Sequence, residues 1–244
     1  MKIKICFILL ITIALIKPAF SQDTDDKGIQ SNVTIIGPGG FSLPFKIAGN
    51  NTEGPSLRGL PFIHKKWEKG RLLLKDKNIT GIGVRYNAYY DRIELLKGNK
   101  AYSIFEQDKV KRIELLNKDS LINQIFIYTA HINTNGEKES GYFQLLIDGE
   151  ISLLKRYTCK IKKPNFSYSM RSGHRNPRYV HTEKYYIKKS KDSIAKPIEM
   201  KWDEFFAYFG SKAKKMKDYA RKIDLSPANE KDLMLILRYA NTIN

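Results

Sequence analysis

Short apolar and β-branched runs, separated by Gly, Asn or Asp, fill the chain from residue 71 to 187. Asp148-Gly149 between two such runs predicts a tight hairpin, because both central residues of a type I′ turn need positive φ. Strands joined by loops this short must pair antiparallel. We predict strands at 71–75, 79–87, 89–96, 101–106, 110–117, 122–132, 141–147, 150–161 and 179–187.

The last fifty residues change from a strand period to a helical one. Trp202, Phe205, Phe206 and Phe209 fall at i, i+3, i+4 and i+7, which places them on one face of a short helix that Gly210 ends. A second apolar stripe follows at Ala213, Met216, Ala220 and Ile223. A third helix is predicted to begin with Ser226 as its cap and Pro227 at its first position, and to be the most buried of the three.

These patterns predict an α+β protein: a curved, mostly antiparallel meander of about eight or nine strands, with three C-terminal helices packed on it. Residues 22–69 are rich in Gly, Pro, Asn and Asp and are predicted to form a flexible leader and an irregular arm. A short strand is predicted there at 33–36, and the segment from Gly59 to Trp67 is expected to pack on the domain. Residues 70–244 are predicted to form a single β-rich domain, with the helices from about residue 200 onward.

The first residues have the parts of a secretory signal. Lys2 and Lys4 give a positive start, residues 5–16 are almost all apolar, and Ala19 and Ser21 are the small residues that precede a cleavage site. The apolar run is shorter than the roughly 20 residues of a membrane span. We therefore predict a signal peptide at 1–21, export, and no transmembrane segment in the mature chain.

The mature chain is strongly basic and carries one thiol. Cleavage removes three lysines and no acid, so the formal net charge of +18 falls to +15. Cys159 is then the remaining cysteine, which excludes an intramolecular disulfide. Its place in a strand-like run is typical of a small buried residue.

The segment from Lys160 to Lys196 combines many cations with aromatic residues and holds only two acids, Glu183 and Asp192. Cations attract polyanions, and aromatic rings can stack on bases or sugars. The predicted polyanion-binding residues are Lys162, Lys163, Arg171, Arg175, Arg178, Tyr179, Lys188 and Lys189.

Motifs for chemistry are weak. The four histidines show no metal-binding spacing, so no metal and no other cofactor is predicted. Carboxylate pairs such as Asp91 with Glu94 are interpreted as surface charges rather than as a glycosidase pair. We assign no catalytic residue.

Several segments resemble uncharacterised secreted proteins of bacteria with two membranes. The likeness is carried by Gly59-Leu60-Pro61-Phe62, by the stretch from Val84 to Glu94, and by the closing Arg238-Tyr239-Ala240-Asn241. The resemblance implies a β-rich body with C-terminal helices and a location in the periplasm or at the periphery of the outer membrane. It implies no catalytic residues.

The function predicted from these features is a non-enzymatic envelope protein that binds a partner through its basic surface. An anionic polymer, a lipid headgroup or an envelope protein is the expected partner. Two alternatives stay open: a carrier of a lipid or another apolar ligand between sheet and helices, and a hydrolase with scattered residues.

Overall fold

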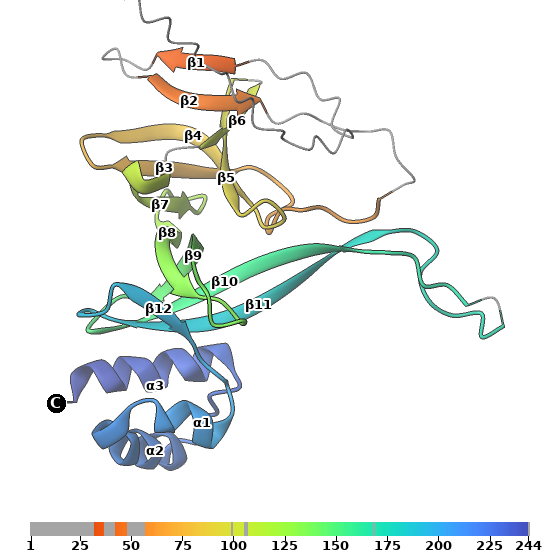
Figure 1. The fold of residues 1–244 in the computed structure, drawn as a ribbon. Coiled ribbons are helices and arrows are strands. Elements are labelled where there is room, and N and C mark those ends of the chain that lie inside the picture. The colour runs from red at the N-terminus through yellow and green to blue at the C-terminus, as the bar shows by residue number, and fades with distance from the viewer. Residues whose placement is uncertain are drawn as a thin grey trace, which may run out of the picture.

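A computed structural model describes residues 32–36, 42–47, 57–98, 100–104, 107–167 and 169–243. The predicted signal peptide and much of the predicted leader lie outside these residues. The α+β class is confirmed, with twelve strands in one sheet and three α-helices (Figure 1). The strands are β1 (Asn32–Ile36), β2 (Ser42–Ile47), β3 (Glu68–Leu74), β4 (Asn78–Asn87), β5 (Arg92–Lys97), β6 (Lys100–Ile104), β7 (Val110–Leu116), β8 (Ile122–Ile132), β9 (Lys138–Ile147), β10 (Ile151–Lys162), β11 (Arg178–Lys189) and β12 (Ile194–Pro197).

The sheet is mostly antiparallel, but it is not one continuous meander. Strands β3 to β6 pair in sequence order, and the chain then returns so that β7 pairs with β3 on its other edge. A 3₁₀ turn at Gln107–Lys109 precedes β7. Sequence patterns reveal where strands lie, whereas this change of neighbour is decided by how the curved sheet closes over its core.

Five strands form a closed ring that the sequence did not predict. Strands β8 to β11 pair antiparallel in order, β12 pairs with β11, and β12 then pairs in parallel with β8. The closing contact joins only Ile194 and Ala195 to Ala130 and His131. Strand β12 was not predicted because a four-residue strand with two apolar residues carries almost no periodic signal.

The predicted hairpin at Asp148-Gly149 is present, but its turn differs from the prediction. Three residues separate β9 from β10, and neither Asp148 nor Gly149 has a positive φ. The glycine serves packing instead, because a Cβ on Gly149 would lie 2.7 Å from the Asn241 side chain. That side chain accepts from the Ile151 N–H at 2.8 Å and donates to the Ile151 carbonyl at 3.0 Å. The last helix is thereby fixed to the hairpin.

The helices are α1 (Trp202–Ala207), α2 (Ala213–Lys222) and α3 (Glu230–Thr242), with a 3₁₀ turn at Gly210–Lys212. Helix α3 contacts β9 and β10, while α1 and α2 lie beyond it (Figure 1). Phe205, Phe206, Met216, Leu233 and Ile236 are fully buried there. No helix among the described residues is long and apolar enough to cross a membrane.

The predicted start of the third helix is wrong. Asn229, rather than Ser226, is the N-cap, and its side chain accepts from the N–H groups of Lys231 and Asp232. Ser226 instead begins a turn in which its carbonyl accepts from the Asn229 N–H at 3.0 Å. Ile223 was also misplaced, because it is 48% exposed rather than part of the buried stripe.

The segment before β3 packs on the sheet as predicted. The Ile63 N–H donates to the Tyr86 carbonyl, and the Ala88 N–H donates to the Pro61 carbonyl. The Arg85 guanidinium lies between two aromatic rings, 3.5 Å from the Phe62 centroid and 4.0 Å from the Trp67 centroid. These contacts hold the segment against β4.

Candidate anion-binding site

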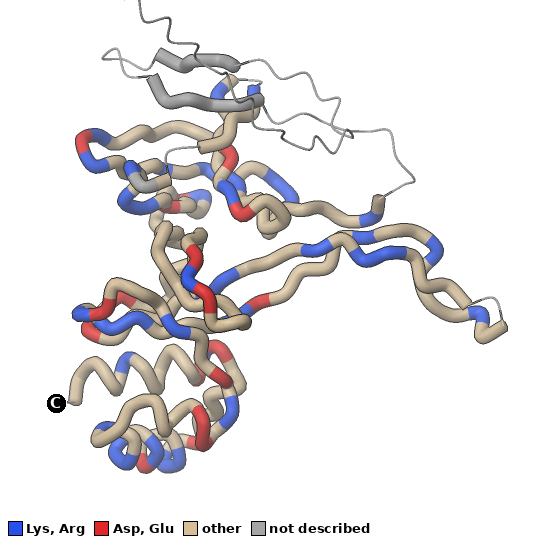
Figure 2. Tube along the Cα trace, in the orientation of Figure 1, with Lys and Arg blue, Asp and Glu red and all other residues tan. Residues whose placement is uncertain are grey.

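The first part of the basic segment predicted from the sequence, up to about Lys184, lies in an arm that projects from the body (Figure 1). Strands β10 and β11 pair along their whole length, from Ile151 with Lys189 to Lys162 with Arg178. The ends of the two strands reach past the ring, and residues 163–167 and 169–177 lie at the tip. Figure 2 shows Lys and Arg along both sides of this arm.

Strand alternation sorts the arm's side chains onto two faces. Lys162 and Arg178 are paired, and Lys160 and Lys184 point to the same side as they do. Arg58 joins this side through a parallel bridge to Arg178. We call Arg58, Lys160, Lys162, Arg178 and Lys184 the basic face.

The cations of the basic face have no acid bound to them among the described residues, although Arg156, the cross-strand partner of Lys184, binds Asp91 on the same side. None of its five cations makes an ion pair with a described acid. The polar residues between the cations are also paired with each other, since the hydroxyls of Thr158 and Thr182 form a hydrogen bond at 2.6 Å. From Lys184 to Arg178 the face extends for roughly 20 Å at the usual rise of a strand. A cationic strip of this length suits an extended anionic ligand.

The one acid in the arm's sequence between residues 158 and 184 points the other way. Glu183 lies on the opposite face and binds the Lys155 ammonium at 2.7 Å. Lys155 also binds Glu230 of α3 at 2.8 Å, and Tyr185 donates to the same Glu230 oxygen at 2.6 Å. Burial alone would lower the pKa of Lys155, but these hydrogen bonds to Glu183 and Glu230 raise it above its ordinary value. Glu183 is thus held away from the basic face.

The predicted site residues are only partly brought together. Lys162 and Arg178 lie on the basic face and Arg175 lies beside it, whereas Lys163 and Arg171 are exposed elsewhere in the tip. Tyr179 faces the body, with its ring 5.6 Å from that of Tyr89, and burial raises its pKa.

Lys188 and Lys189 lie at the other end of β11, roughly 30 Å from Tyr179 along the strand. Lys188 donates to the Thr129 hydroxyl at 3.3 Å, and Lys189 lies over the Tyr208 ring. Lys188 and Lys189 are close to the other cations in residue number but not in space, because the two ends of a twelve-residue strand lie far apart.

A pocket of about 230 Å³ lies where the basic face meets the tip, and its lining is basic. The lining residues are Arg58, Phe166, Gly173, His174, Arg175, Asn176 and Arg178. Three arginines and no acidic residue therefore line one hollow.

Backbone pairing builds the pocket's tip-side wall. The Asn165 N–H donates to the His174 carbonyl, and Ser167 pairs with Ser172 in both directions. Gly173 has φ +100°, and a Cβ there would overlap the Asn165 carbonyl. The wall therefore requires glycine at this position.

Arg58 was missed by the sequence analysis, since it precedes the basic segment by about a hundred residues. Its N–H donates to the Pro177 carbonyl, and its carbonyl accepts from the Tyr179 N–H, both at 2.9 Å. This pairing places the Arg58 side chain next to Arg178. No local pattern around Arg58 signals such a contact.

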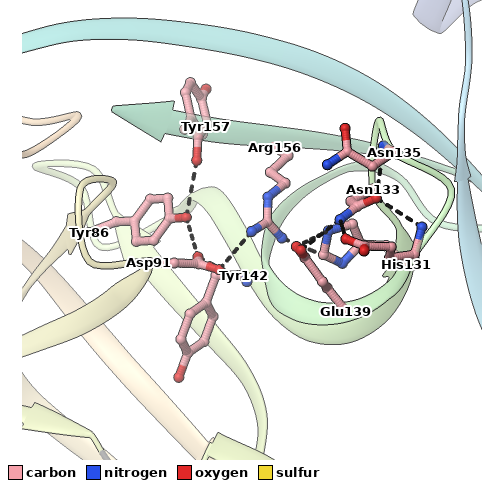
Figure 3. A network of polar contacts seen from close by, with 10 residues as sticks. Tyr86, Asp91, His131, Asn133, Asn135, Glu139, Tyr142, Arg156 and Tyr157 are labelled. Carbon is pink, nitrogen blue, oxygen red and sulfur yellow. Dashed lines mark hydrogen bonds and ion pairs between the residues drawn. The ribbon is translucent and has the colours of Figure 1, made fainter. Parts of the chain in front are cut away.

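A second polar cluster lies at the mouth of the ring (Figure 3). The Asp91 carboxylate accepts from the Tyr86 hydroxyl at 2.5 Å and from Arg156 at 3.0 Å. Arg156 also lies 3.5 Å from His131 Nδ1, and His131 Nε2 lies 3.7 Å from Glu139. Burial, followed by the charge of Arg156, lowers the pKa of His131.

This cluster ties the ring to the turn between β4 and β5. Its members are satisfied mainly by one another, and His131 is only 1% exposed. The predicted interpretation of Asp91 and Glu94 as surface charges is wrong for Glu94, which is 1% exposed and binds Arg85 at 2.7 Å. These groups stabilise the fold.

Cys159 is buried, as its sequence context predicts. Among the residues described, no group of three or more His, Cys, Asp or Glu is placed to hold a metal ion. Comparison of the chain with protein-family models, curated proteins and solved structures finds no match in any of the three.

Proposed function

We propose that this chain is an exported, non-enzymatic binding module that holds a linear anionic polymer along the basic face. The observation that carries the proposal is the sorting of charge in the arm. Five cations without a described ion-pair partner share one face, while Glu183 is bound by Lys155 on the other. Unpaired cations on one strip attract repeated negative charges without first having to break internal ion pairs.

The packing between sheet and helices supports this function over that of an apolar-ligand carrier. The side chains of Phe205, Phe206, Leu233, Ile236 and Leu237 have no exposed surface and fill this interface. A carrier needs a continuous apolar cavity there.

The polar clusters give the hydrolase alternative little support. A hydrolytic site needs a nucleophile or an activated water held beside a base in an open hollow. His131 is instead buried between Arg156 and Glu139, and Lys155 is engaged by two carboxylates.

The location belongs to the same proposal. The apolar run at 5–16 and the small residues before Gln22 support cleavage there and export to the envelope. Intact-mass measurement of the protein isolated from its own cells tests the cleavage before Gln22. A protein that still begins at Met1 would contradict the proposed export signal.

Binding to heparin and to a short oligothymidylate tests the polymer-binding function. Single-stranded DNA binding should weaken with a log–log salt slope of about −0.7 for each phosphate contacted. With four or five cations engaged, affinity should fall steeply between about 50 and 200 mM salt. Affinity that does not change with salt would remove the proposal.

A matched pair of triple variants separates the basic face from general charge. Lys160→Ala, Lys162→Ala and Lys184→Ala remove three exposed lysines of the face. Lys214→Ala, Lys215→Ala and Lys222→Ala remove three exposed lysines of α2. The first set should weaken binding by about tenfold or more and flatten the salt slope, whereas the second should change it by less than about threefold. Equal losses from both sets would mean that only net charge matters.

A further inference from the structure

The pocket at the end of the basic face has a more specific chemistry than the face itself. Arg58, Arg175 and Arg178 line it, and each guanidinium presents a planar fork of donors. Lysines along the face act as point charges, whereas such forks favour oxyanions that can be bound bidentately. The pocket therefore selects for a chemical group as well as for a sign of charge.

The number of arginines indicates which oxyanion fits. A carboxylate offers two oxygens in one plane, and an internal phosphodiester offers two non-bridging oxygens. A phosphomonoester has three terminal oxygens and a charge of about −1.5 to −2 at pH 7. Three arginines lining one hollow match the three oxygens in number, and their three positive charges exceed this negative charge.

Backbone pairing positions two of the pocket's arginines, and a ring contact positions the third. Arg175 lies over the Phe166 ring, 4.4 Å from its centroid. Arg58 is fixed by two backbone hydrogen bonds, and Arg178 begins β11. Since ordering is a cost of binding, a backbone that already brings these three residues together lowers the cost of gathering their side chains around a ligand.

The pocket also lies at a suitable position for an end group. Lys162 and Arg178 mark the outer end of the ribbon, and the backbone pairing of Asn165 with His174 lies beyond it. A polymer that follows the face from Lys184 outward meets the pocket last.

We propose that this pocket binds a terminal phosphomonoester of the anionic polymer, an inference that rests on the proposed function. The Arg58, Arg175 and Arg178 guanidinium groups donate to the phosphate oxygens, and the lysines of the basic face bind the chain behind it.

Two oligothymidylates that differ only in a 5′-phosphate or a 5′-hydroxyl test this proposal. The wild-type protein should prefer the phosphorylated strand by about tenfold or more, as charge-assisted hydrogen bonds allow. A second pair that carries the phosphate or the hydroxyl at the 3′ end covers the opposite strand direction. Equal affinities within both pairs would overturn the terminal subsite while leaving the polymer-binding function intact. If neither heparin nor any strand binds, the polymer-binding function itself fails.

Two variants of one residue keep the test independent of folding. Arg175→Lys retains the charge but removes the planar fork, so it should lose most of the preference for phosphate while keeping more overall affinity than Arg175→Ala. Arg175→Ala should lose the preference and some overall affinity. Lys184→Ala is the control, because it should weaken both strands equally and leave their ratio unchanged. A preference that survives in both Arg175 variants would overturn the assignment.

Competition identifies the source of the phosphate. Thymidine 5′-monophosphate and glucose 6-phosphate carry the same group on a nucleoside and on a sugar. Stronger displacement of the labelled phosphorylated strand by the first indicates a nucleic-acid end, and stronger displacement by the second indicates a phosphorylated saccharide. Displacement by inorganic sulfate as strong as that by inorganic phosphate would overturn selection for a phosphomonoester.

Discussion

The Asp91 carboxylate and the Arg156 guanidinium lie 3.0 Å apart, in a space that Gly141 leaves open. Asp91 comes from the turn before β5, and Arg156 comes from β10 at the mouth of the ring. A Cβ on Gly141 would overlap both Arg156 Nη1 and Asp91 Oδ2. Gly141 of β9 thus leaves room for the ion pair that connects the ring to the turn between β4 and β5.

Gly141→Ala should destabilise the protein by about 1–3 kcal/mol, because it displaces a partly buried, hydrogen-bonded ion pair. Chemical denaturation measures the change in unfolding free energy. Ser140→Ala, at the exposed neighbouring position, is the control and should have little effect. A Gly141→Ala protein as stable as wild type would show that the pair shifts without cost.

Arg85→Met should cost about 3–5 kcal/mol, the range for leaving a buried charge unpaired. Its partner Glu94 is 1% exposed, and Asn87 would remain as a hydrogen-bond donor to it at 2.9 Å. Trp67 fluorescence should also change, since the ring loses the guanidinium 4.0 Å from its centroid. Arg85→Lys keeps the charge and should lose less, and equal losses in the two variants would argue against the charge as the cause.

His131 should make the fold less stable in mild acid. Its pKa is lowered in the fold, so the unfolded chain binds a proton more readily, and stability falls as pH drops through the ordinary His value of about 6.5. The groups around it are Arg156 and Asp91, which oppose each other, and Glu139, which favours the charged form.

His131→Gln should therefore reduce the loss of stability between about pH 7 and pH 5, measured by denaturation across that range. His64 has a lowered pKa too, through burial, so His64→Gln should remove a separate part of the loss. An unchanged pH profile in His131→Gln would contradict this account.

Lys155→Met should destabilise the protein by about 1–2 kcal/mol, because it leaves Glu183 and Glu230 without their shared cation. The cost is kept small by the exposure of the two carboxylates, 47% and 35%. Hydrogen exchange at the start of α3 should rise, since Glu230 lies in its first turn. Lys212→Met, which removes a weaker contact with Glu150 at 3.7 Å, is a matched control with a smaller expected effect.

Cys159 should resist thiol reagents in the folded protein. Its side chain is buried, and burial raises its pKa, which lowers the fraction of reactive thiolate. In a Cys6→Ser chain, labelling should be slow in native buffer and fast in denaturant. Rapid native labelling would mean that the arm opens near His181, whose ring lies 3.7 Å from the Cys159 sulfur.

The sequence alone predicted the parts of this fold that depend on local periodicity. The nine strands expected between 71 and 187 correspond to β3 through β11, although the third was predicted to begin at Tyr89, and β5 begins at Arg92 after a turn that Asp91 ends. The aromatic stripe from Trp202 to Phe209 likewise identified the first helix. Period and turn residues are properties of neighbouring residues, so they are readable without a structure.

The candidate site could be predicted only in part. The basic composition of 160–196 indicated the arm, but composition cannot separate Arg178 from Tyr179, which point to opposite faces once the pairing of β10 and β11 is fixed. Composition also could not exclude Lys188 and Lys189 from the site, although they lie at the opposite end of β11 from Arg178.

Tertiary structure decided the contacts between distant segments. Arg58 pairs with Arg178, the Asn241 side chain bonds to the Ile151 backbone, and Ala195 pairs with His131 to close the ring. In each case the two residues are too far apart in the sequence for a local pattern to predict the contact. The amino-acid order determined where strands, helices and positive charge would lie, because these follow from local residue patterns. Which cations share a face, and which glycines must stay small, was determined only when folding brought separate strands into register.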